Sequence, residues 1–93
     1  MSPTDNSAIL AQAIAEKADA EREFALAHTA LVKAREAWWR EWLVYDAKLK
    51  KNPKADPHPR LAETRAAYDE TQPPFFAAQT HEVIMRAVPD AIR

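Results

Sequence analysis

The feature that most constrains the fold of this chain is a long run without helix-breaking residues near its start. No proline lies between Pro3 and Pro53, and the whole chain of 93 residues contains no glycine. Ala, Glu, Lys, Arg and Leu, the strongest helix formers, supply most of this run. We therefore predict one continuous helix over about 3–51. At 1.5 Å per residue it is roughly 70 Å long, too long for the remaining chain to cover.

The missing glycine also argues against other fold classes. Tight hairpin turns, phosphate-binding loops and nucleotide-binding turns depend on glycine, which tolerates positive φ and close backbone approach. Alanine supplies about a fifth of the residues, which favours helix further. The predicted fold class is all-α. Because splitting so short a chain would leave too little buried surface in each piece, we expect a single helical domain over 1–93.

Prolines mark where the long helix ends. Pro53 and Pro57 lie in segment 52–58, for which we predict a turn, because proline lacks an N–H and disfavours helix in the residue before it. A second helix is expected over about 57–71, with a proline at its first position. The chain then folds as an antiparallel helical hairpin.

The return arm of this hairpin contains further prolines. Pro73 and Pro74 are expected to kink the arm or to divide it, with a third helix over about 74–88. Pro89 is expected to end this helix and to leave 89–93 as a frayed tail. The arm is therefore predicted to be proline-kinked or two-piece, which gives two or three helices in all.

A 4-3 spacing typical of a coiled coil recurs along the long helix. The predicted seam contains Leu10, Ile14, Lys17, Glu21, Phe24, His28, Leu31, Arg35, Trp38, Trp42, Tyr45 and Leu49. Four of these residues are polar, which a plain two-stranded zipper tolerates poorly. Packing in a helical bundle is favoured instead, because long charged side chains can bury their stems there and extend their charges into water.

An antiparallel return predicts which side chains meet across the hairpin. With the turn near residue 54, Tyr68 lies near Trp38 and Trp42, and Ile84 lies near Phe24. Large aromatic rings would therefore form a common core close to the turn.

In the same register the return arm ends near the level of Glu21. Apolar residues nearer the N-terminus then have no partner within the chain, and a long single helix gains little from helix propensity alone. A second copy is the simplest cover, so the sequence predicts a helical-bundle homodimer. The candidate self-association residues are Ile9, Leu10 and Ile14.

Three tryptophans lie within five residues of the long helix. Trp38 and Trp42 share a face and are expected in the core, whereas Trp39 points elsewhere. Exposed tryptophan is enriched at protein interfaces. Trp39, with Arg40 and Tyr45, is therefore the candidate site for binding a protein partner, and burial in the homodimer is the alternative role of Trp39.

Basic residues gather around the predicted turn. They are Lys48, Lys50, Lys51, Lys54 and Arg60. Such a cluster beside aromatic groups could bind the phosphates of a nucleic acid. The alternative is that it complements the C-terminal end of the long helix, where cations are stabilising. The formal net charge of −1 gives no overall attraction for nucleic acid, so this partner is expected less than a protein.

Catalytic and cofactor chemistry has little support in the sequence. The chain has no cysteine, and His28 and His81 do not have the spacing of a metal motif. No Ser or Thr lies in a context that suggests an activated nucleophile. We expect no enzyme activity, no cofactor and no metal. No signal peptide or membrane span is evident, so we expect a cytoplasmic protein without membrane contact.

These observations rank three functions. The first is a non-enzymatic helical protein–protein interaction module that acts by occupying a surface, as an adaptor, an assembly factor or a small inhibitor. The accessory proteins with which phages inhibit host machinery are an analogy for this class, based on architecture alone. The alternatives are a nucleic-acid-associated helical protein that uses the basic turn, and a small-ligand binder.

Overall fold

The computed structural model of this chain describes residues 3–92, with side chains from residue 6 onward. Two helices make up this part of the chain: α1 spans Pro3–Lys51 and α2 spans Pro59–Ile92. A loop over 52–58 joins them, and the described residues contain no strand. The predicted all-α helical hairpin is confirmed, and α1 covers the range expected from its sequence.

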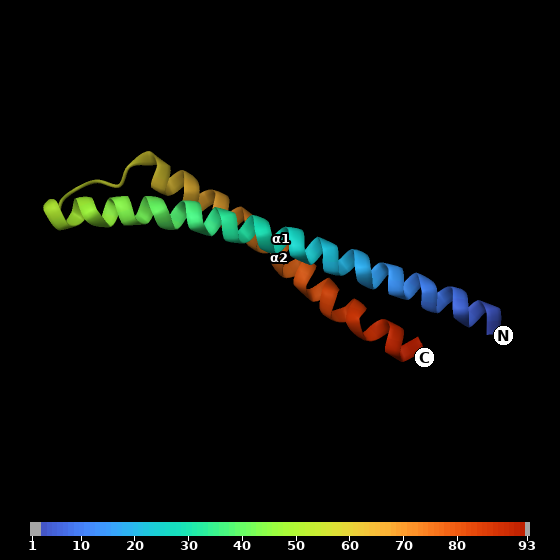
Figure 1. Cartoon of the computed structure of the whole chain (residues 1–93). Coiled ribbons are helices and arrows are strands. Elements are labelled where there is room, and N and C mark those ends of the chain that lie inside the picture. The colour runs from blue at the N-terminus through green and yellow to red at the C-terminus, as the bar shows by residue number, and fades with distance from the viewer. Residues whose placement is uncertain (1–2, 93) are drawn as a thin grey trace.

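The hairpin is a thin rod. Its dimensions are 74 × 16 × 14 Å, and its radius of gyration is 21.3 Å, whereas a compact domain of this length would have about 12 Å. In Figure 1, α2 begins on one side of α1 and lies on the other side near the C-terminus, so the two helices wind around each other. Most of the surface of each helix therefore faces away from the other helix.

The loop does not cap the rod but runs back along α1 (Figure 1). The Tyr45 hydroxyl donates a 3.1 Å hydrogen bond to the Ala55 carbonyl, and the Asn52 side chain accepts one from the Lys54 amide. His58, at the end of the loop, reaches back to Glu41. The last turns of α1 consequently lie beside the loop, and α2 begins next to the middle of α1's C-terminal half.

The return arm is one continuous helix, with Pro73, Pro74 and Pro89 inside it. Of the two forms predicted for this arm, the structure has the undivided one, with no break between 71 and 74. The predicted tail over 89–93 is wrong, because the helix continues to Ile92; Arg93 lies outside the described residues. Adjacent prolines remove only two N–H donors from the helix, and aromatic packing against α1 on both sides of them holds the helix together. Pro89 itself is buried.

The residues that pack between α1 and α2 follow an alternating spacing of three and four. On α1 they are Leu10, Ala13, Lys17, Ala20, Phe24, Ala27, Leu31, Ala34, Trp38, Glu41 and Tyr45. On α2 they are Leu61, Thr64, Tyr68, Thr71, Phe75, Ala78, Glu82, Met85, Pro89 and Ile92. All of them are buried or half-buried. This arrangement is a two-stranded antiparallel coiled coil.

The predicted seam on α1 is half correct. One set of its positions, from Leu10 to Tyr45 in steps of seven, does pack against α2. The other set, which includes Ile14 and Trp42, is displaced by one residue, because alanines such as Ala20 occupy the seam instead. Ala20 is only 1% exposed, since its small side chain lets the two backbones approach closely. The polar members of this displaced set, Glu21, His28 and Arg35, therefore lie beside the seam, whereas Lys17 lies in it.

Aromatic pairs fix the register of the hairpin. Tyr68 stacks on Trp38 with ring centroids 5.6 Å apart, as predicted. Phe24, however, meets Phe75 at 5.5 Å and not Ile84. The rest of α2 consequently extends well past the level of Glu21, where the return arm was expected to end.

Candidate protein-binding surfaces

Two surfaces border the packed seam, one on each side of the hairpin, and charged residues of both helices identify them. Hydrogen bonding to Glu82 raises the pKa of Arg86, and the charges of Glu82 and then Glu21 add to this rise, so Arg86 lies near Glu21. On the opposite side, His81 Nδ1 lies 3.7 Å from Glu23 Oε2. We call these sides the tryptophan flank, which contains Glu21, and the alanine flank, which contains Glu23.

Large apolar side chains are exposed on both flanks. The tryptophan flank has Ile14, Trp39 and Trp42 on α1 and Phe76 and Val83 on α2. The alanine flank has Ile9, Leu26, Val44 and Ile84. Leu43 is also exposed but lies on the side of α1 that faces away from α2. The exposed apolar surface is therefore divided into two long patches.

On the tryptophan flank, α1 carries a second stripe with the same alternating spacing as the buried seam. We call it the α1 stripe; it contains Ala11, Ile14, Ala18, Glu21, Ala25, His28, Val32, Arg35, Trp39 and Trp42. All of these residues except the half-buried Val32 are exposed. A spacing of three and four is what a helix needs to pack against another helix. α1 therefore has a second face with this spacing, and α2 does not cover it.

The residues predicted to bind a protein partner are separated by the structure. Trp39 and Arg40 line a shallow pocket of about 260 Å³ together with Arg35 and Glu36, and Trp39 is 56% exposed. Tyr45 is half-buried, and its hydroxyl is bonded to the loop. The structure thus brings Trp39 and Arg40 together and places Tyr45 apart from them.

Trp42, which was expected in the core, lies at the edge of the seam. Its ring borders a second shallow pocket of about 290 Å³, between α1, the loop and the beginning of α2. The other residues of this pocket are Trp38, Pro57, Leu61, Ala62 and Arg65. The Arg65 guanidinium lies 4.9 Å from the centre of the Trp38 ring. This end of the tryptophan flank therefore combines exposed aromatic surface with a cation.

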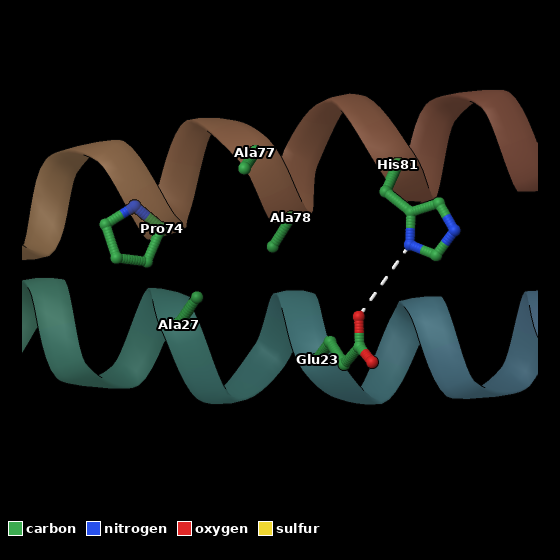
Figure 2. Close-up of a pocket in the computed structure, with 6 residues that line it drawn as sticks. All are labelled: Glu23, Ala27, Pro74, Ala77, Ala78 and His81. Carbon is green, nitrogen blue, oxygen red and sulfur yellow. Dashed lines mark ion pairs between the residues drawn. The ribbon is translucent and has the colours of Figure 1, made fainter.

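The alanine flank contains a groove between the two helices, shown in Figure 2. It encloses about 450 Å³ and is lined by Glu23, Ala27, Pro74, Ala77, Ala78 and His81. In Figure 2 the side chains of Ala27 and Ala78 point into the space between the helices, and Glu23 and His81 point toward one another. This groove was not predicted from the sequence; the run of small residues on α2 opposite an alanine of α1 was its signal.

The three residues predicted for self-association lie on different faces. Leu10 is half-buried in the seam, next to Ala13, which is 4% exposed. Ile9 is exposed on the alanine flank and Ile14 on the tryptophan flank. The expectation that this end of α1 has no partner within the chain is wrong for Leu10 and Ala13, because α2 extends far enough to pack against them. The exposed surfaces of Ile9 and Ile14 remain.

The five cations near the loop do not form one free patch. Lys48, Lys50 and Lys51 lie in the last turn of α1, where they complement the negative end of the helix. Lys50 pairs with Asp46 at 3.3 Å, and Arg60 pairs with Glu41 at 3.2 Å. The remaining cation, Lys54, lies on the loop. Part of the positive charge predicted to bind phosphate is therefore compensated within the chain.

The histidines and carboxylates of the described residues are not gathered into a metal site. No group of three His, Cys, Asp or Glu side chains within them could hold a metal ion. His28 contacts the ring of Phe75, at 5.9 Å between centroids, on the flank opposite to His81. Over the same part of the chain, neither helix has an apolar stretch that could cross a membrane.

Comparison with models of protein families, with curated proteins and with solved structures found no match to this chain.

Proposed function

We propose that this chain is a non-enzymatic helical protein–protein interaction module that acts by occupying a surface of a protein partner, as an adaptor, an assembly factor or a small inhibitor. Its working surfaces are the tryptophan flank and the alanine flank. Each flank presents apolar side chains on a straight helical scaffold, so a helix or a helical surface of another protein can lie along it.

The observation that carries this proposal is the amount of surface that the hairpin leaves uncovered. Its accessible surface is 6897 Å², whereas a compact monomer of the same mass would have about 5,400 Å². Only Ala13, Ala20 and Leu31 are buried hydrophobic residues in the described part of the chain. Exposed apolar patches of this kind mark interaction sites in soluble proteins.

The nucleic-acid alternative has weaker support, because acidic residues within the chain pair with two of the five cations near the loop. Binding that depends on phosphate contacts falls steeply as the salt concentration rises. If the purified chain is retained on DNA or RNA at low salt, and if this retention falls steeply as the salt concentration rises, the nucleic-acid alternative is favoured over a protein partner.

Affinity capture with variants of each flank tests the proposal. The full chain serves as bait in an extract of its source cells, beside Trp39→Ala for the tryptophan flank and Ala77→Glu for the alanine flank. Leu43→Ala is the matched control, because Leu43 is 51% exposed on neither flank. We expect a protein other than this chain to be retained by the wild type and the control.

One flank variant should reduce this retention at least tenfold, which corresponds to about 1.4 kcal/mol, while its melting temperature stays unchanged. If no protein distinguishes the flank variants from Leu43→Ala, the proposal is wrong.

A further inference from the structure

We propose that the tryptophan flank binds the same flank of a second copy of this chain, in antiparallel alignment, with the two-fold axis beside His28. This inference rests on the proposed function and names the partner of one flank. The two hairpins would stack as two layers, α1 against the partner's α1 and α2 against the partner's α2, in a four-helix bundle. The alanine flank then stays available for a different protein.

Side-chain size along the α1 stripe fits this alignment. With His28 at the axis, Ala18 lies opposite the partner's Trp39, and Ala25 lies opposite the partner's Val32. The alanines of the stripe all lie in its N-terminal half and both of its tryptophans lie in its C-terminal half, so an antiparallel pair places alanines against larger side chains. Such alternation allows close packing without voids.

Charge along the same stripe fits it as well. Glu21 and Arg35 lie seven residues before and after His28, so each one meets its opposite charge on the partner. Over all of α1, residues 3–32 carry a net charge of −3 and residues 33–51 carry +3. The facing parts of α2, 59–75 and 76–92, add −1 to each half. A parallel dimer would instead bring like charges together along its whole length.

The second helix also places apolar surface at the axis. Phe75 lies beside His28, so the next residue, Phe76, is at the level of the axis, and its side chain is exposed on the tryptophan flank. The two copies of Phe76 would then meet across the axis and exclude water from the centre of the interface. At each outer end of the interface, Ile14 would pack against the partner's Trp42.

The contact is large enough for a stable dimer. From residue 14 to residue 42 the stripe is about 42 Å long, and the hairpin is 16 Å wide. The product is about 670 Å² in projection, close to the roughly 800 Å² that each partner contributes to a standard interface. The hairpin's surface exceeds that of a compact monomer by about 1,500 Å², so an interface of this size removes about half of the excess.

Charge reversal on the full chain tests this alignment by sedimentation. The variants are Glu21→Arg and Arg35→Glu, each measured alone and as an equimolar mixture. Glu16→Arg and Lys33→Glu make the same charge changes on exposed positions outside the stripe and serve as controls. Thermal unfolding by circular dichroism checks that each variant is folded.

We expect the wild type and both controls to be dimers at tens of micromolar. Each stripe variant should raise the dimer dissociation constant at least tenfold, because both contacts across the axis become repulsive. The mixture should recover the wild-type affinity, because every Arg then faces a Glu. In a parallel dimer each position faces itself, so a single reversal would leave the affinity unchanged, and that result would overturn the proposal.

A wild type that is monomeric at tens of micromolar, or a mixture that does not associate, would also overturn it. These outcomes do not contradict the proposed function if a flank variant still retains less of a captured protein than the wild type does. The proposed function and this inference fail together only if the chain is monomeric and captures nothing through either flank.

Discussion

His58 Nε2 donates a 2.7 Å hydrogen bond to Oε2 of Glu41, and this contact fastens the loop to the side of α1. Arg60 Nε donates to the other oxygen of the same carboxylate at 3.2 Å. The Glu41 side chain is 22% exposed, at a position of the seam where alanine occupies the earlier repeats. A carboxylate at this position therefore joins α1, the end of the loop and the beginning of α2.

The first prediction concerns the pH dependence of stability. Hydrogen bonds from His58 and then from Arg60 hold the pKa of Glu41 below its ordinary value near 4.5. The stability that this carboxylate contributes is thus fully present above that value and is lost as the pH falls through the lowered pKa. Glu41→Gln should melt at a lower temperature than the wild type at pH 7.

This difference should shrink as the pH falls below 4.5 and through the lowered pKa of Glu41, which thermal unfolding by circular dichroism can measure at fixed protein concentration. A variant that melts like the wild type at pH 7 would show that the contact adds nothing to stability.

The second prediction concerns the stacked pair of Trp38 and Tyr68, whose rings are 5.6 Å apart at an interplanar angle of 13°. Tyr68→Ala removes a half-buried ring from the seam and should lower the free energy of unfolding by about 2 kcal/mol, less than a fully buried aromatic residue would cost. Tyr68→Phe keeps the ring and should cost far less. Urea unfolding compares the two variants, and equal losses would contradict a role for the stacking.

The third prediction tests the close approach of the helices at Ala20, which is 1% exposed. Ala20→Leu forces a larger side chain between the backbones and should destabilise the hairpin by about 1–3 kcal/mol. Ala15→Leu is the matched control, because Ala15 is exposed on the same helix, and a change there should stay within about 0.5 kcal/mol. A stabilising effect of Ala20→Leu would mean that the seam is not packed as described.

The alanines of the seam on α1 explain how far the fold could be predicted. The absence of proline and glycine set the extent of α1, and Pro53 and Pro57 located the reversal, because both effects are local to the backbone. The seam was misplaced at every second position because large side chains were expected inside. At Ala20 and Ala27 the interface is instead formed by small residues that permit close backbone contact, which hydrophobicity alone does not reveal.

The candidate surfaces were predictable to a similar degree. Trp39 could be identified as exposed, because it lies on a different face of the helix from Trp38, which is in the seam. The groove beside Ala27 could not be identified, because it depends on which turn of α2 lies opposite. That register is set by ring contacts such as the one between Phe24 and Phe75, which a single sequence does not specify.

The last prediction concerns the prolines within α2. Proline inside a helix is about 3 kcal/mol less favourable than alanine, since it removes a hydrogen bond and its ring crowds the preceding turn. Packing of the aromatic residues on either side keeps α2 continuous despite this penalty, so removing the penalty should stabilise the hairpin. Pro73→Ala should raise the free energy of unfolding by at least about 1 kcal/mol, after allowing for the greater freedom of the unfolded chain.

Pro59→Ala provides the control, because Pro59 is the first residue of α2, where no hydrogen bond is lost to proline. It should leave stability unchanged or lower it slightly. Urea unfolding of both variants decides the matter: if Pro73→Ala is no more stable than Pro59→Ala, the helix must already relieve the strain at Pro73 by a local change in its backbone.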